Sequence, residues 1–261
     1  MQRGSASGSR AGWCAAAALG AVLVVAASAA PAGRGADGRF EKRESSHFVL
    51  YQDVDIDDTA GIRGSRHFED QVLATLESAH DTVEALLGVR PPRRIRVTVY
   101  DPGDFDARFA GLFRFPAAGF YGDSIHIRGG TVLDARLVRV LHHELVHAAF
   151  HAEAPSLVLP AWMNEGLAEW VEARAAGYQS LTDGERVFLA RRAQAGALYS
   201  LAQLSARSLG AFGPQEAAVA YLQSRAFIDY LASAHGDRRV RDWVREVLRT
   251  GDIDRALART F

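Results

Sequence analysis

The sequence of 261 residues has a single cysteine, Cys14, which lies within an apolar segment at the N-terminus. The rest of the chain can therefore form neither a disulfide framework nor a metal site made of thiolates. Any metal ion in this protein has to be held by histidine, aspartate or glutamate side chains.

The sequence also lacks an excess of charge of either sign. Its 30 lysine and arginine residues stand against 31 aspartate and glutamate residues, and no run of five basic residues occurs. Electrostatic binding to nucleic acid or to anionic lipid is therefore not expected. The sequence contains neither a G-x-S-x-G nucleophile elbow nor a glycine-rich phosphate loop, which removes serine hydrolases and P-loop proteins as candidates.

The N-terminal segment has the layout of a secretory signal. Arg3 and Arg10 precede an uncharged stretch over 11–30, whose most apolar part is Leu19–Val25. We therefore expect a signal peptide over 1–30, a glycine-rich linker over 31–38, and an extracytoplasmic domain, secreted or periplasmic, over 39–261. The alternative is a membrane anchor with that domain outside, because about twenty uncharged residues can cross a bilayer.

Hydrophobic periodicity predicts an α+β fold. Alternation favours strands over 47–51 and 94–100 and a hairpin over 119–127, while helical spacing over 68–87 ends at Gly88. From Thr131 onward, nearly every segment has a helical pattern. A small N-terminal sheet with one helix, followed by a mostly helical half, indicates a domain whose two halves meet at a cleft.

The most informative pattern is His143-Glu144-Leu145-Val146-His147. Thr131 and Asp134 resemble a capping box, so we expect a helix from Thr131 to about Phe150. On such a helix the two histidines are one turn apart and can converge on one metal ion. Glu144, beside the first histidine, is then placed to take a proton from water at that ion.

A second helical segment supplies carboxylates. Residues 160–170 begin with Pro160, which suits a first helical turn, and place Glu165 and Glu169 on one face. Two histidines and one glutamate occupy three of the four positions around a tetrahedral ion. The fourth position then stays open for water.

At these residues the chain resembles the gluzincin superfamily of zinc metallopeptidases, which includes thermolysin, the aminopeptidase N group and the small peptidase-MA-like domains of exported bacterial proteins. The resemblance is carried by H-E-x-x-H followed by N-E-G-x-A-E, covers 131–172, and extends more loosely over 48–261. It implies one zinc ion per chain, with His143, His147 and Glu165 as ligands and Glu144 as general base.

The resemblance also implies supporting residues. Asn164 precedes the third ligand, as it does in many members of the superfamily. Glu169 lies where related enzymes have an acidic residue that orients the first histidine, so we expect its carboxylate to accept the free N–H of His143. A strand formed by Gly119, Phe120 and Tyr121 is a candidate edge on which an extended substrate could form backbone hydrogen bonds.

Tyr221 is the candidate donor of a hydrogen bond to the oxyanion, because related enzymes often use a tyrosine or histidine from the later helical half. Periodicity alone places Tyr221 in the core just as readily. Tyr230, farther along the same segment, is expected in the core. His142 and Tyr121 are the next candidates for the donor.

The sequence therefore predicts an exported zinc metallopeptidase that hydrolyses amide bonds in a peptide or protein substrate. Thermolysin has a further histidine, and aminopeptidase N has a motif that anchors a free amino terminus. Neither has a counterpart in this sequence, so endopeptidase and exopeptidase activity both stay open. Two alternatives remain: a non-catalytic exported binding domain braced by zinc, and a hydrolase of cell-wall amide bonds. Glu144 argues against the first, since a structural zinc site needs no base and usually closes its fourth position.

Overall fold

The computed structural model describes residues 40–53, 62–112, 117–129, 132–210 and 212–261. The signal peptide expected over 1–30, the linker over 31–38 and Thr131 lie outside the described residues. Among the described helices, none is both long and apolar enough to cross a membrane.

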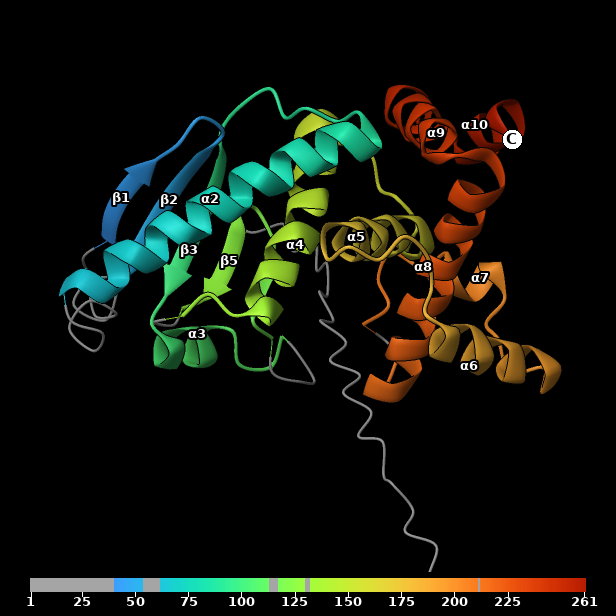
Figure 1. The fold of residues 1–261 in the computed structure, drawn as a ribbon, viewed down its shortest axis with the longest axis horizontal. Coiled ribbons are helices and arrows are strands. Elements are labelled where there is room, and N and C mark those ends of the chain that lie inside the picture. The colour runs from blue at the N-terminus through green and yellow to red at the C-terminus, as the bar shows by residue number, and fades with distance from the viewer. Residues whose placement is uncertain (1–39, 54–61, 113–116, 130–131, 211) are drawn as a thin grey trace, which may run out of the picture.

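The first half of the chain forms one five-stranded sheet (Figure 1). Its order is β1-β2-β3-β5-β4, in which β2, β3 and β5 are parallel and the two edge strands run antiparallel to their neighbours. The strands span Phe40–Glu44 (β1), Phe48–Asp53 (β2), Ile95–Tyr100 (β3), Gly119–Tyr121 (β4) and Ile125–Arg128 (β5). The expected hairpin is thus confirmed as β4 and β5, and β4 is an edge strand.

Helix α2 (Ile62–Leu87) lies across one face of this sheet in Figure 1. The side chains of a strand alternate between the two faces of the sheet. Those on the helix side are fully buried, namely Phe48 and Leu50 of β2 and Val97 and Val99 of β3. The short helix α3 (Pro102–Arg108) packs against β5.

The second half is helical, which confirms the α+β expectation. Helix α5 packs against α4 on one side and α8 on the other, and α9 returns to contact α2. Figure 1 shows α5 between the sheet half and the later helices. The helices span Ala135–Glu153 (α4), Ala161–Ala175 (α5), Asp183–Gln194 (α6), Leu201–Leu204 (α7), Pro214–His235 (α8), Asp237–Thr250 (α9) and Ile253–Thr260 (α10).

Helix α4 begins at Ala135, four residues later than the sequence predicts. Its N-cap is Asp134, whose carboxylate accepts the backbone N–H of Leu137 at 2.8 Å. A capping side chain of this kind satisfies one of the N–H groups that a helix start leaves free. The expected start at Thr131 is therefore wrong, although Asp134 belongs to the same capping pattern.

Close backbone packing joins α4 to the edge strand. A Cβ atom on Gly119 would lie 2.8 Å from the backbone oxygen of His126 and 3.0 Å from Cγ1 of Val140 in α4. Only glycine fits there without displacing its neighbours, so β4 lies directly against the helix that carries the two histidines.

A second close approach joins α5 to α8. A Cβ atom on Gly166 would lie 2.8 Å from the backbone oxygen of Ser224 and 3.1 Å from Cγ1 of Ile228. Because Gly166 has no side chain, α8 packs directly against α5 next to Glu165.

Replacing Gly166 with alanine should lower the free energy of unfolding by about 1–3 kcal/mol, because the added methyl group overpacks this contact. Gly184 in α6 is the matched control, since a Cβ there meets nothing within 4 Å. Gly184→Ala should raise the free energy of unfolding by about 0.5–1 kcal/mol, because glycine in a helix costs conformational entropy. Urea unfolding measures both, and a Gly166→Ala protein as stable as the wild type would contradict the close packing.

Candidate metal centre

Two histidines of α4 and one glutamate of α5 converge at a buried point between the helices. Nε2 of His143 lies 3.3 Å from Oε2 of Glu165, and Nε2 of His147 lies 3.5 Å from the same oxygen. All three residues are at most 3% exposed. The one-turn spacing on α4 turns both imidazoles to the same side, as the sequence predicts.

This cluster has the composition of a metal site. One ligand atom from each of the three residues lies within 4.8 Å of the others. Nε2 of His147 is buried and has no hydrogen-bond partner among the described residues, which is costly unless a ligand satisfies it. Two imidazole nitrogens and one carboxylate oxygen could therefore hold a metal ion here.

Asn164 orients the second histidine. Its Oδ1 lies 3.1 Å from Nδ1 of His147, so the amide oxygen accepts the N–H at that nitrogen. The tautomer that this hydrogen bond favours leaves the Nε2 lone pair directed at Glu165 and the centre of the cluster. The structure thus places Asn164 beside the ligand residues, in contact with the second histidine.

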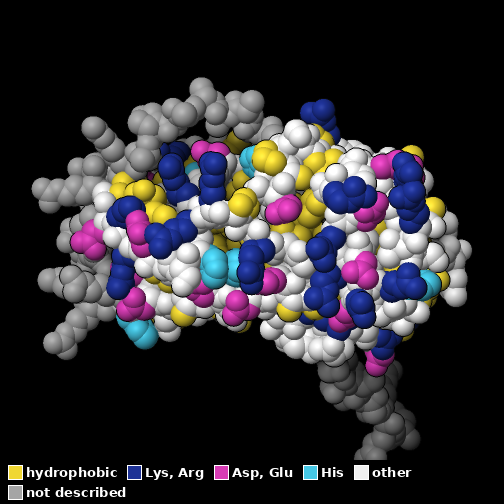
Figure 2. Space-filling view, turned by 90° about the horizontal axis from the view of Figure 1, so that it is seen from above, with side chains coloured by type: hydrophobic (Ala, Val, Ile, Leu, Met, Phe, Trp, Pro, Cys, Tyr) yellow, Lys and Arg dark blue, Asp and Glu magenta, His cyan; other side chains and the backbone are white. Residues whose placement is uncertain are grey.

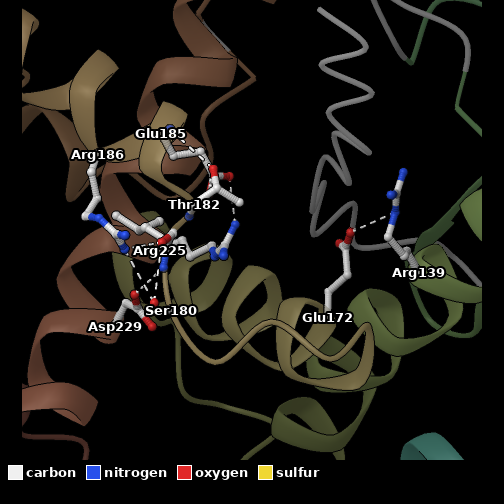
Figure 3. A network of polar contacts seen from close by, with 9 residues as sticks. Arg139, Glu172, Ser180, Thr182, Glu185, Arg186, Arg225 and Asp229 are labelled. Carbon is white, nitrogen blue, oxygen red and sulfur yellow. Dashed lines mark hydrogen bonds and ion pairs between the residues drawn. The ribbon is translucent and has the colours of Figure 1, made fainter.

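The first histidine has two carboxylates near its Nδ1 atom, that of Glu169 and that of Glu172. Oε2 of Glu172 lies 3.4 Å from Nδ1 of His143, whereas Oε1 of Glu169 lies 3.9 Å from it. Glu172 also contacts Arg139 of α4 at 3.3 Å, and Figure 3 shows its carboxylate turned toward that guanidinium. Burial, together with the charge of Glu172, raises the pKa of Glu169 to about 8.

A carboxyl group with a pKa near 8 is mostly protonated at neutral pH and is then a weaker acceptor for an imidazole N–H. Of the two carboxylates, Glu172 is the closer to Nδ1 of His143, a nitrogen that has no hydrogen-bond partner among the described residues. The expectation for Glu169 came from its position one turn after Glu165, and Glu172 lies one further turn along the same helix. His143, Glu169 and Glu172 also form a second group whose ligand atoms lie within 4.8 Å of one another.

Glu144 lies in the same buried space as the cluster. Burial raises the pKa of its carboxyl group, while the two neighbouring histidines and the backbone N–H of Tyr121, which hydrogen-bonds it, act in the opposite direction. Its Oε2 is buried and has no hydrogen-bond partner among the described residues. The carboxylate is thus held by the edge strand through one contact and leaves an oxygen available for proton transfer.

Tyr221 of α8 lies near enough to the same carboxylates for their charges to act on its phenol. The residue is 5% exposed. Burial raises the pKa of its phenol well above the usual value, and the charges of Glu165, Glu169 and Glu144 raise it further. The hydroxyl group therefore stays protonated at physiological pH and is able to donate a hydrogen bond.

The other candidate donors are placed differently. The side chain of His142 is 2.8 Å from the backbone oxygen of Val138 in its own helix, and the Tyr121 hydroxyl is 2.7 Å from Nδ1 of His151. The prediction for Tyr230 is wrong, because 63% of that residue is exposed. Tyr221 is thus the candidate whose electrostatic neighbours are the site's own carboxylates.

A cavity of about 290 Å³ reaches the cluster from the side of His147. Its polar lining next to the site consists of Tyr121, His147 and Asn164, and much of the remaining wall is apolar, including Phe150 and Leu157. This cavity gives a molecule from solvent access to the His147 side of the buried cluster.

The chain matches no protein-family model and no curated protein sequence. Its function is therefore inferred from the residues of the site itself.

Removing the partner of His143 should weaken metal binding. Glu172→Ala should lower the affinity for zinc, used as the probe ion, by about 10- to 100-fold, the range found for partners of this kind. Glu169→Ala should have a smaller effect, and Glu172→Gln should retain most of the affinity because an amide oxygen at that position is also able to accept the N–H. Competition with a chromophoric chelator measures all three, and a larger loss in Glu169→Ala would reverse the assignment.

Proposed function

We propose that the protein is a zinc-dependent metallopeptidase that hydrolyses peptide bonds. The observation that carries the proposal is the convergence of both Nε2 atoms on Oε2 of Glu165, at 3.3 and 3.5 Å. In a tetrahedral site with zinc–ligand bonds of about 2.0–2.1 Å, neighbouring ligand atoms are about 3.3–3.4 Å apart. The two distances fit that edge length, and the set of two histidines and one glutamate is typical of catalytic zinc.

When bound, zinc supplies a Lewis acid that lowers the pKa of water and polarises a carbonyl group. In this chain, Glu144 would take a proton from the attacking water and pass it to the nitrogen of the leaving amine. Its buried position, next to the edge strand and the two histidines, suits a group that has to exchange a proton at the cluster.

Two further elements would complete the reaction site. The protonated hydroxyl of Tyr221 would donate a hydrogen bond to the oxygen of the tetrahedral intermediate. The edge strand β4 would pair with an extended substrate, because one side of a terminal strand has no neighbour in the sheet. Gly119, Phe120 and Tyr121 are the residues of that strand.

A zinc-braced binding domain is the second candidate, and the state of Glu144 argues against it. A structural site gains nothing from a buried carboxylate with an oxygen left without a partner. Hydrolysis of cell-wall amides would use the same residues and differs only in the substrate. We include action outside the cytoplasm in the proposal because residues 1–30 have the layout of a secretory signal.

Replacing Glu144 with glutamine tests the proposal, because glutamine keeps the shape of the side chain but cannot accept the proton. Turnover of a peptide library should fall by about two or more powers of ten, while zinc content and fold are preserved. Chelation of the wild-type protein should abolish turnover and added zinc should restore it. Full activity in Glu144→Gln, or activity indifferent to chelation, would refute the proposed chemistry.

Tyr221→Phe tests the oxyanion donor. Loss of the hydroxyl should lower kcat by about 10²–10³, with little change in KM or in the free energy of unfolding. Tyr230→Phe is the matched control, since Tyr230 lies on the same helix but is exposed. Equal kcat values in the two variants would remove Tyr221 from the reaction.

A further inference from the structure

A second hollow adjoins the cavity beside the cluster. Both are lined by Tyr121, His151 and Pro155. The second hollow lies between the last turn of α4 and the start of β3, and we call it the basic groove after four of its lining residues: Lys42, Arg93, Arg94 and Arg96. A chain that enters the cavity can therefore extend along this groove.

The basic groove carries an excess of positive charge in a chain that is nearly neutral overall. Asp123 is the one acidic residue among the described residues that line it. Arg94 is paired with Glu44 at 2.6 Å, and Lys42 contacts the same carboxylate. Two of the four basic groups are thereby partly neutralised by one neighbouring glutamate.

The other two arginines have no such partner. Within the described residues, no carboxylate lies at ion-pair distance from Arg93 or Arg96, and Arg96 stacks over the Tyr51 ring at 5.6 Å. Figure 2 shows the molecule from the side that carries the β1–β2 turn, the connection from α2 to β3 and the end of α4. On this face, basic side chains lie beside hydrophobic ones. Two planar guanidinium groups are thus free to bind carboxylates beside the proposed substrate path.

The direction of the edge strand decides which part of a substrate reaches the groove. β4 runs from Gly119 to Tyr121, so it ends at the residue that borders the groove. Antiparallel strand pairs outnumber parallel ones about two- to three-fold. A substrate strand that pairs antiparallel with β4 places the residues N-terminal to its scissile bond at the Tyr121 end.

We propose that the basic groove selects polypeptide substrates with acidic side chains on the N-terminal side of the scissile bond, held chiefly by Arg93 and Arg96. This proposal rests on the proposed peptidase function. It adds that the specificity is electrostatic and that it is determined on the sheet half of the molecule, away from the metal ligands.

Quenched fluorescent peptides with one common central sequence test this specificity. One peptide has three acidic residues on the N-terminal side of the scissile bond, and a second has them on the C-terminal side. A third has glutamine in their place. For the wild type, kcat/KM should be at least about tenfold higher for the N-terminal acidic peptide than for the glutamine peptide, and the ratio should shrink as salt screens the charges. A ratio near one, or a preference for acidic residues on the C-terminal side, would overturn the proposal.

Charge reversal locates the selectivity. In Arg93→Glu/Arg96→Glu, the ratio of kcat/KM values should fall to one or below, and Arg93→Gln/Arg96→Gln should give an intermediate value. Arg191→Glu/Arg238→Glu is the control, because it makes the same change in net charge at exposed positions of α6 and α9. An unchanged ratio in the groove variant, or an equal fall in the control, would contradict the assignment.

A binding measurement separates this proposal from the peptidase proposal. Glu144→Gln protein is titrated into labelled acidic and glutamine peptides, and fluorescence anisotropy reports affinity without turnover. Tighter binding of the N-terminal acidic peptide, lost on Arg93/Arg96 reversal, would support the groove even if the wild type cleaved none of the peptides. Cleavage of all peptides at the same rate, with equal binding, would instead refute the groove and leave the peptidase proposal standing.

Discussion

Two histidines and three glutamates are buried where α4 packs against α5, and the rest of the structure has to accommodate this group of ionisable side chains away from water. Isolated buried charges cost several kcal/mol each unless partners or a metal ion compensate them. On the outer side of the group, Asn164 hydrogen-bonds His147 and Arg139 forms an ion pair with Glu172. On the inner side, a divalent cation would offset the carboxylates and satisfy both imidazoles.

The two halves of the chain hold this group from opposite sides. On one side, Gly119 lets the edge strand lie against α4, and the N–H of Tyr121 reaches Glu144. On the other side, Gly166 lets α8 lie against α5, and Tyr221 comes near the same carboxylates. The proposed base, the proposed oxyanion donor and the substrate edge therefore depend on close backbone packing at two glycines.

Sequence patterns predicted the parts of the molecule that depend on one helix. The spacing of the two histidines on α4 is an example, since one helical turn fixes their common direction. Patterns failed where contacts between elements decide, because the neighbours of α8 leave Tyr230 exposed. No pattern on α5 alone shows that its crossing with α4 brings Glu172 closer to His143 than Glu169. Strand β1 (40–44) was missed because four of its five residues are charged, and only its pairing with β2 makes it a strand.

Anomalous diffraction at the zinc absorption edge, from crystals of protein reconstituted with zinc, tests the central claim most directly. The account predicts one peak per chain, within about 2.0–2.2 Å of Nε2 of His143, Nε2 of His147 and a carboxylate oxygen of Glu165. The absence of a peak after reconstitution would contradict it. So would a peak bound by Nδ1 of His143 together with Glu169 and Glu172, the second group that could hold a metal ion.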